Sequence, residues 1–270
     1  MKTLFCCGLC FFALFVSLQL RAQDEEEPAS AKEPAPKAPK DTSVTDFNLA
    51  IIALQRGDHN RVLQITEGKE EEHFKRMRAS ILQERGQNRF FKADIDGSLA
   101  DFNEVVELMP ERDPYHWQRG ITFYYAGKYQ EGKEQFERHQ KVNSQDVENA
   151  VWHFLCAVRG PEGSVESARR NLISIKEDTR VPMKEVHSLF AGTGSAEAVM
   201  VAARKMGNPA KSEIAKNALL YAHLYLAIYF EALGKEDLMK EHIKKAAVDY
   251  RMDHYMGKVA QVHAKLRGVK

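Results

Sequence analysis

Hydrophobic residues in the body of this chain recur at helical spacing, in paired segments separated by short turns rich in glycine or proline. The clearest pairs lie between Ser80 and Ser144, where aligning Gly86 with Gly120 places similar residues opposite one another. Phe102 then matches Phe136, which is again 34 residues further along. A fixed period of this length, built from paired helices, predicts the stacked hairpins of a solenoid.

The two clearest hairpins share further landmarks. A residue that tolerates close approach is expected at each turn, and Ala93 and Gly127 stand there. Pro110 is expected to end the second helix of its hairpin, because proline cannot continue a helix. Asp113–Pro114 is then expected to open the next helix, with proline in the favoured first turn.

Weaker hairpins flank this pair on both sides. The first begins near Val44, where Asp46 is expected to cap a helix, and Gly57 breaks it. The fourth begins at Val147 and turns at the Gly160–Gly163 stretch. Its return helix is expected to carry an apolar stripe formed by Val165, Ala168, Leu172 and Ile175.

The last part of the chain supplies two more hairpins and a final helix. The fifth hairpin is expected over residues 186–202, with a glycine-containing turn at Gly192–Ser195. The sixth is expected over residues 218–247, and a capping helix is expected from His254 to Arg267. The sequence therefore predicts an all-α, right-handed α-solenoid of about six helical hairpins plus a C-terminal capping helix, over residues 43–270.

The first 22 residues have the three-part pattern of a secretory signal peptide. Lys2 gives a positive start, an apolar run follows from Leu4 to Leu18, and Ala22 is a small residue suited to cleavage. We expect cleavage after Ala22, export to the periplasm or outside the cell, and no stable membrane insertion afterwards. An uncleaved membrane anchor is the alternative, because the apolar run is close to the shortest that spans a bilayer.

Residues 23–42 are acidic at first and then rich in proline, alanine and lysine, without apolar periodicity. We expect a disordered linker there. Three of the four cysteines, Cys6, Cys7 and Cys10, fall within the expected signal peptide, so only Cys156 would remain. One thiol makes no internal disulfide, so packing alone must hold the exported body together.

The charge balance argues against nucleic acid as a partner. Removing Lys2 and Arg21 from the 39 basic residues leaves 37, against 38 acidic ones. Nucleic-acid-binding domains usually have a strong basic excess, which this chain lacks.

Residues 44–267 resemble the tetratricopeptide (TPR) superfamily. The resemblance rests on the 34-residue period and on Trp152, Leu155 and Cys156, which match the Trp-x-x-Leu-small signature of its first helices. Together with the signal peptide, the chain also resembles bacterial periplasmic TPR adaptors of the NlpI lipoprotein kind. That resemblance implies docking of envelope-maintenance enzymes such as proteases and peptidoglycan hydrolases, although no cysteine suited to lipidation follows the apolar run.

Motifs of common catalytic sites are missing. The sequence has no H-E-x-x-H, no P-loop, no G-x-S-x-G, and no C-x-x-C after residue 22. The ten histidines never stand three or four residues apart, so no two share a helical face that binds zinc. His116 and His223 occupy positions of large aromatic residues and are interpreted as packed side chains. We therefore expect no enzyme activity, no cofactor and no metal.

In TPR folds the first helices line a concave face, so the resemblance implies a partner groove there. Aromatic side chains with nearby arginines suit a peptide that carries apolar anchors and a carboxylate. The expected groove residues are Gln83, Arg85, Gln87, Arg89, Phe90, Trp117, Arg119, Ile121, Tyr124, Tyr125 and His153. Two alternatives stay open: Phe91 and Tyr125 could pack between helices, and Arg85 and Arg119 could pair with acidic residues inside the array.

The sequence thus favours a non-catalytic, exported TPR adaptor or scaffold that binds a protein or peptide partner on its concave face. A self-assembling structural protein, in which terminal repeats of two copies stack into a homo-oligomer, is the alternative. An enzyme with a dispersed site is a distant third hypothesis.

Overall fold

The computed structural model describes residues 42–270, which form one compact unit. The expected signal peptide and linker lie outside these residues, apart from Thr42. The described part contains helices and no strand. The helices are α1 (Thr42–Gln55), α2 (His59–Thr66), α3 (Glu72–Phe91), α4 (Ile95–Leu108), α5 (Trp117–Tyr125), α6 (Tyr129–Gln140), α7 (Val147–Arg159), α8 (Val165–Arg170), α9 (Met183–Ala191), α10 (Ala196–Arg204), α11 (Glu213–Ala232), α12 (Glu236–Lys244) and α13 (Tyr255–Leu266).

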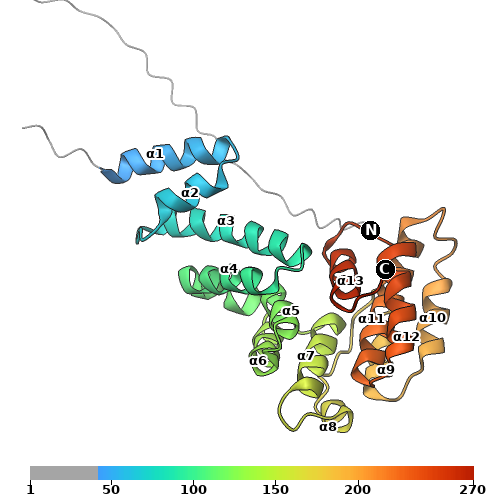
Figure 1. Cartoon of the computed structure of the whole chain (residues 1–270). Helices are drawn as coiled ribbons and strands as arrows, with labels where there is room; N and C mark the ends of the chain where they lie inside the picture. The colour runs from blue at the N-terminus through green and yellow to red at the C-terminus, as the bar shows by residue number, and fades with distance from the viewer. Residues whose placement is uncertain (1–41) are drawn as a thin grey trace, which may run out of the picture. The chain divides into compact units, whose positions relative to one another are not determined.

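Consecutive helices pair into hairpins, from α1–α2 to α11–α12, and neighbouring hairpins pack against each other along the chain (Figure 1). This arrangement confirms the predicted TPR-like α-solenoid. The final helix, α13, lies between the C-terminal end of α3 and the α11–α12 hairpin (Figure 1). It therefore contacts helices that are far from it in the sequence as well as its neighbours.

The small residues of the first helices lie where two helices cross. A Cβ atom at Gly86 would come within 2.7 Å of the Phe102 ring, and one at Gly120 within 2.7 Å of the Phe136 ring. Real Cβ atoms do not approach carbon so closely, so a larger residue would push the two helices of the hairpin apart. The matched glycine and phenylalanine positions are thus one packing unit, repeated in two hairpins.

The turns also repeat their geometry. Gly127 and Gly234 have left-handed backbones, with φ of 71° and 68°, and Ala93 adopts the same conformation with φ of 64°. Glycine enters this region without a steric penalty, whereas alanine does not. The equivalent turns therefore require the same left-handed backbone conformation. In the second hairpin, Ala93 adopts this conformation at a steric cost.

Two expected helix starts are wrong. Helix α1 already begins at Thr42, so Asp46 lies inside it and pairs with Lys69 at 2.6 Å instead of capping it. Asp113–Pro114 belongs to a 3₁₀ helix, Pro110–Tyr115, and α5 starts only at Trp117. His116 caps α5, because its Nδ1 accepts from the backbone N–H of Arg119 at 3.3 Å.

The return helix of the fourth hairpin is shorter than expected. Helix α8 ends at Arg170, so Leu172 and Ile175 lie in a non-helical segment. This segment runs back to the start of α7, where Asp178 accepts from the backbone N–H of Val147 at 3.1 Å. This bond satisfies a backbone donor in the first turn of α7. If α8 continued as a helix, Asp178 would not reach that donor.

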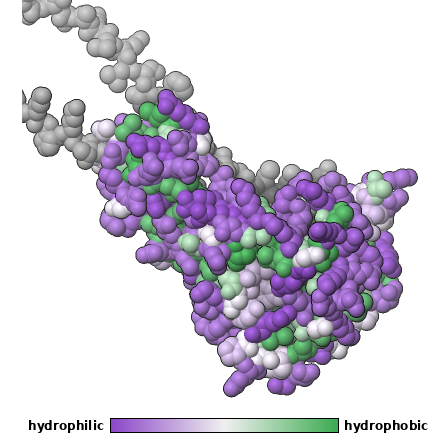
Figure 2. Space-filling model, viewed as in Figure 1, coloured by the Kyte–Doolittle hydropathy of each residue, from purple (hydrophilic) through white to green (hydrophobic). Residues whose placement is uncertain are grey.

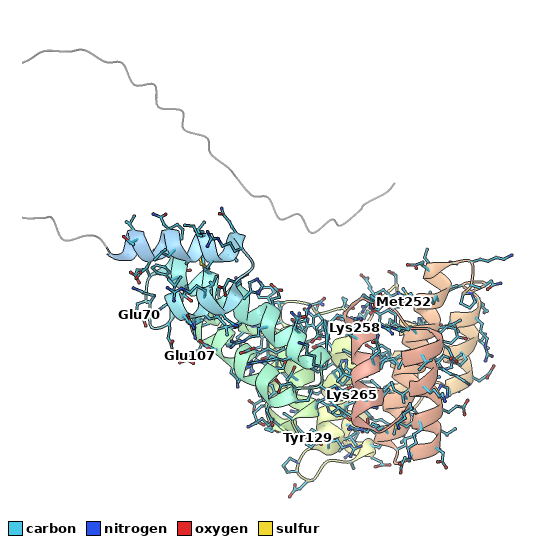
Figure 3. All side chains as sticks on the ribbon, turned by 45° about the horizontal axis from the view of Figure 1, so that its top comes forward. Glu70, Glu107, Tyr129, Met252, Lys258 and Lys265 are labelled. Carbon is cyan, nitrogen blue, oxygen red and sulfur yellow. The ribbon has the colours of Figure 1, made fainter. Side chains whose placement is uncertain are left out.

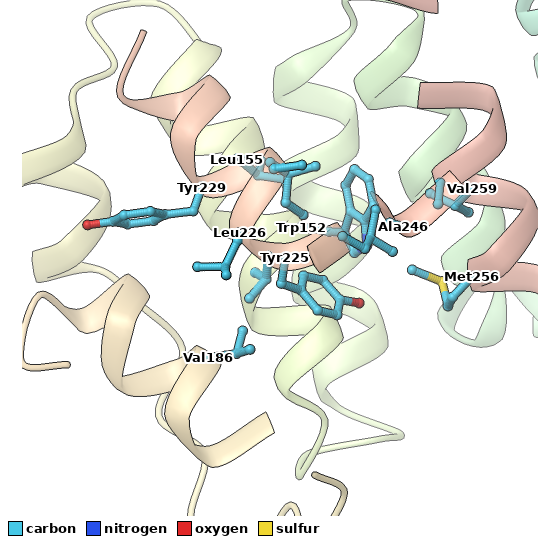
Figure 4. Close-up of a cluster of buried hydrophobic side chains, with 14 of the residues drawn as sticks. Trp152, Leu155, Val186, Tyr225, Leu226, Tyr229, Ala246, Met256 and Val259 are labelled. Carbon is cyan, nitrogen blue, oxygen red and sulfur yellow. The ribbon is translucent and has the colours of Figure 1, made fainter. Parts of the chain in front are cut away.

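Buried apolar residues form two clusters. The small cluster spans α1 to α4, and Val62, Leu82 and Val105 are fully buried in it. The large one spans the rest of the unit and extends back to Phe90. Figure 4 shows side chains of α7, α9, α11 and α13 meeting in the large cluster: Trp152, Leu155, Val186, Tyr225, Leu226, Tyr229, Met256 and Val259.

Most of the face shown in Figure 2 is hydrophilic, with separate hydrophobic patches. One patch lies over the N-terminal hairpin, where Val44, Leu49 and Ile52 of α1 are 57%, 44% and 42% exposed. No preceding hairpin covers these side chains within residues 42–270. None of the helices in this range is both long and apolar enough to cross a membrane.

Candidate functional site

Part of the expected partner groove is filled by the chain's own C-terminal helix. Tyr255, the first residue of α13, stacks on the Phe90 ring with centroids 5.9 Å apart. Its ring also meets Trp117 edge-on at 4.7 Å and Phe91 at 5.3 Å. The aromatic side chains of α3 and α5 are therefore brought together, as expected, but α13 covers several of them.

The rest of α13 is held by polar contacts with distant helices. His263 Nδ1 and the Tyr125 hydroxyl are 3.0 Å apart. At the end of the helix, the Lys265 ammonium donates to the Lys92 carbonyl oxygen at 2.7 Å. Figure 3 labels Lys265 on α13. These contacts fix α13 to the first helices of the second and third hairpins.

A buried carboxylate on α11 completes this attachment. Glu231 accepts from Arg267 Nε at 2.7 Å, from Arg159 at 3.3 Å and from the Tyr124 hydroxyl at 3.3 Å. Burial lowers the pKa of His263 to about 4, although Glu231 acts in the opposite direction. His263 is therefore neutral at pH 7, and the guanidinium groups of Arg159 and Arg267 are the charged partners of Glu231.

The arginines of the expected groove pair inside the array, as one of the open alternatives stated. Arg85 and Arg89 both donate to the buried carboxylate of Asp101, at 2.7 Å and 2.8 Å. Arg119 donates to Asp113 at 3.1 Å and to Gln135 at 2.7 Å. Their forked donors are thus largely committed to intramolecular acceptors.

The remaining expected residues are spread along the first helices. Gln83 and Gln87 are half-buried on α3. His153 is buried on α7, where burial lowers its pKa and its Nε2 lies 3.3 Å from Glu137. Ile121, which is buried on α5, lines a cavity together with Trp117.

This space, called the central cavity below, has a volume of about 360 Å³ and lies among α5, α6, α7, α11 and the start of α13. Its walls are mostly aromatic or apolar, and one end is charged. The lining residues are Trp117, Ile121, Phe136, His139, Asp146, Glu148, Asn149, Trp152, Arg180, Tyr221, His254, Tyr255 and Met256.

The charged end joins the start of α7 to the segment that follows α8. Arg180 pairs with Asp146 and Asp178 at 2.6 Å each, and also with Glu148. Glu148 in turn accepts a hydrogen bond from the Tyr225 hydroxyl. Burial raises the pKa of Glu148 to about 7, because the desolvation cost outweighs the attraction of Arg180.

Three lining residues carry buried polar atoms without a hydrogen-bond partner within residues 42–270. They are Trp152 Nε1, a donor, Asn149 Oδ1, an acceptor, and the Tyr255 hydroxyl, which can do both. Buried polar atoms are almost always paired in folded proteins. Each of these three atoms has almost no surface open to a water molecule, so they lie behind the cavity wall and are not paired from within the cavity.

Sequence reasoning missed most of the cavity. Asp146 and Glu148 flank the expected start of the fourth hairpin, a position where acidic residues cap helices in any protein. Arg180 lies in an irregular segment, which offered no periodic signal. Tyr221 and Tyr255 belong to expected helices, but their meeting across the unit depends on the placement of α13.

No protein-family model matches the chain. A curated relative does: the sequence is 26% identical over 176 residues to the lipoprotein NlpI homolog of Haemophilus influenzae. The chain is similar to NlpI-like TPR proteins. The alignment covers 64% of this chain and 52% of the relative, so the chain spans about half the length of that curated protein. The helical-hairpin fold and the similarity to this relative both indicate TPR repeats.

Proposed function

We propose that this protein is a non-catalytic TPR adaptor that binds a protein or peptide partner beside the central cavity. The central cavity, with its aromatic walls and its charged end, is the observation that carries the proposal. The six-hairpin solenoid supports it, because such arrays present extended surfaces to partners. The similarity to an NlpI homolog supports an adaptor rather than an enzyme, and no cofactor enters the proposal.

The proposed adaptor acts outside the cytoplasm. The signal-peptide pattern of residues 1–22 supports export, residues 23–42 would act as a linker, and the relative's name describes a lipoprotein. Mass spectrometry of the chain purified from cell fractions tests this. A mature chain that begins at Gln23 in the exported fraction is expected, whereas retention of residues 1–22 in the membrane fraction would establish the anchor alternative.

Partner capture with matched variants tests the binding site. The bait is the chain from residue 42 onward, compared with a Trp117→Ala/Tyr221→Ala variant, in which two half-buried walls of the cavity are lost. Tyr115→Ala is the control, because Tyr115 is an aromatic residue that is 62% exposed and does not line the cavity. Each variant must still unfold cooperatively before it is used.

A partner held by the intact bait and by Tyr115→Ala, but lost from the double variant, is the expected result. Equal capture by all three baits would place the binding surface away from the cavity. Capture of nothing except the same chain would favour self-assembly.

Self-assembly is the second candidate, and the apolar face of α1 favours it. Val44, Leu49 and Ile52 are exposed on the terminal hairpin, where a solenoid would stack on another copy. Light scattering after size-exclusion chromatography distinguishes the two candidates. A concentration-dependent dimer that is lost in Leu49→Glu, but retained in Val248→Glu at another exposed position, would support it.

A further inference from the structure

We propose that the central cavity binds the side chain of a lysine or arginine residue in the partner. This inference rests on the adaptor function proposed above and names the chemistry that its site recognises. It follows from the charge balance and the aromatic walls of the cavity.

The charge balance at the charged end favours a cation. Three carboxylates, those of Asp146, Glu148 and Asp178, surround the single guanidinium of Arg180. Arg180 is committed to these acceptors, so it offers little attraction to an incoming anion. A positively charged side chain would meet excess carboxylate charge in a partly desolvated site, where the attraction is stronger than in water.

The walls suit the same ligand. Trp117, Trp152, Tyr221 and Tyr255 all line the cavity, and aromatic faces attract ammonium and guanidinium groups. Their hydrocarbon surface also accommodates the methylene stem of a lysine or arginine side chain. Tyr221 is held in place by stacking on His254, with centroids 5.8 Å apart and planes 16° apart.

The volume fits one residue better than a long segment. About 360 Å³ lies at the lower end of the usual range for ligand pockets, about 300–1,000 Å³, and far above the ~30 Å³ share of one water molecule. We therefore infer an anchor pocket for a single side chain, beside which the rest of the partner binds on the surface.

Small probes test this chemistry directly. The probes are the Nα-acetyl N-methylamides of lysine, arginine, norleucine and glutamate, together with butylamine, titrated into residues 42–270. The chain has two tryptophans, Trp117 and Trp152, and both line the cavity, so intrinsic fluorescence reports on its occupancy. Saturable changes are expected with lysine, arginine and butylamine, which all carry a cation on an alkyl stem, with binding about tenfold weaker for norleucine and none for glutamate.

Variants of the charged end locate the binding. Glu148→Gln and Asp146→Asn should each weaken lysine binding about tenfold while the fold is retained. Glu104→Gln is the matched control: it removes one carboxylate from another ion pair, that with Arg78, far from the cavity lining. Thermal melting of every variant verifies that it is folded, and the Asp146 variant provides a second test where Glu148→Gln fails to fold.

The pH dependence gives an independent readout. Glu148 loses its proton around pH 7, so lysine binding should strengthen from pH 6 to pH 8, and Glu148→Gln should abolish that rise. Lysine remains charged throughout this range. The other titratable or charged groups that face Glu148 or line the cavity are Asp146, Asp178, Arg180, Tyr221, Tyr225, His139 and His254.

Equal binding of norleucine and lysine, tighter binding of glutamate, no saturable binding below 50 mM, or an unaffected Glu148→Gln variant would each overturn the inference. The adaptor proposal has a separate outcome. If the partner is still lost from the Trp117→Ala/Tyr221→Ala bait while the lysine probe does not bind, the adaptor site stands and only its assigned ligand chemistry fails.

Discussion

The N-terminal region, α1 to α4, and the C-terminal region, α5 to α13, are built from the same hairpin but are held together differently. The N-terminal region has the smaller apolar cluster and relies on ion pairs such as those of Arg85 and Arg89 with Asp101. The C-terminal region has the larger cluster, and α13 ties its hairpins to one another and to the C-terminal end of α3. Its Glu231 pairs with arginines from two other segments.

This difference shows that a solenoid need not be uniform in stability. Where each hairpin contacts only its neighbours, the array opens locally at little cost, as one-dimensional repeat proteins do. A helix that crosses the array couples distant hairpins, so they must open together. We therefore expect the C-terminal region to unfold as one unit together with the end of α3 that α13 contacts, and the rest of the N-terminal region to open separately, before it.

The largest effects should come from the two cores. Phe154→Ala removes a fully buried ring that packs on Phe190 at 5.1 Å, and should cost about 3–5 kcal/mol. Leu82→Ala at a fully buried site of the small cluster should cost about 2–5 kcal/mol. Hydrogen exchange should show the Phe154→Ala effect from α5 to α13, and the Leu82→Ala effect only in α1 to α4. Equal spread of both effects would refute the division into two regions.

The next effect concerns the attachment of α13. Glu231→Gln leaves the guanidiniums of Arg159 and Arg267 without a carboxylate, which should cost about 2–3 kcal/mol. The cost lies below that of a fully buried pair, because both arginines reach solvent. Glu236→Gln, which breaks an exposed pair with Lys240, is the control and should cost less than ~1 kcal/mol. Denaturant unfolding measures both, and similar values would show that α13 is held by apolar packing alone.

The next, smaller effect is a loss of stability of the C-terminal region at acidic pH. Burial holds the pKa of His263 near 4, below the unfolded value of about 6.5, so the unfolded chain takes up the proton first as pH falls. The stability of the C-terminal region should therefore decrease between pH 6.5 and 4, by up to about 1.4 kcal/mol per pH unit for this residue. The groups that face His263 are Glu231, Arg159, Arg267 and Tyr125.

His263→Gln should flatten that pH dependence, whereas His59→Gln in the N-terminal region should leave it unchanged. Glu148 acts with the opposite sign. Its pKa is raised to about 7, so its protonation favours the folded chain as pH falls from 7 toward 4.5. The difference in unfolding free energy between each variant and the parent chain, measured at every pH, isolates the contribution of the histidine. An unchanged slope of stability against pH in His263→Gln would contradict the assignment of the acid effect to His263.

The smallest expected effect is an increase in stability, caused by a substitution in the N-terminal region. Ala93 has a left-handed backbone, φ 64°, at the turn where the next hairpin has Gly127. Ala93→Gly should remove a steric cost and stabilise the chain by about 1 kcal/mol, whereas Gly127→Ala should destabilise it by about the same amount. Thermal melts compare the two. A loss of stability in Ala93→Gly would mean that the entropy of the unfolded chain outweighs the strain.

Local patterns in the sequence predicted the hairpins well. The period that relates Gly86 to Gly120 and Phe102 to Phe136 reflects contacts inside one hairpin, which lie close together in the chain. Helix ends were less predictable. His116 caps α5 through an imidazole nitrogen, and α8 ends early because Asp178 and its neighbours bind the start of α7. These features depend on tertiary contacts that no periodicity records.

The candidate site was only partly predictable. Trp117 and Ile121 were expected at the concave face, and they do line the cavity. The covering of Phe90 by Tyr255 was not foreseen, because an amphipathic final helix shows which face it buries but not the surface it contacts. The role of Arg180 could not be predicted for a similar reason, because two of its three partners, Asp146 and Glu148, lie more than thirty residues before it in the sequence.

The contact between Lys265 and the Lys92 carbonyl joins residues 173 positions apart, and it has a consequence for biosynthesis. The early hairpins can form as they leave the ribosome, but Phe90, Phe91 and Trp117 stay uncovered until α13 has been made. Long-range closure of this kind is slow, and the exposed aromatic surface favours chaperone binding or aggregation in the interval. The docking of α13 onto α3 and α5 thus determines when this aromatic surface is protected during synthesis.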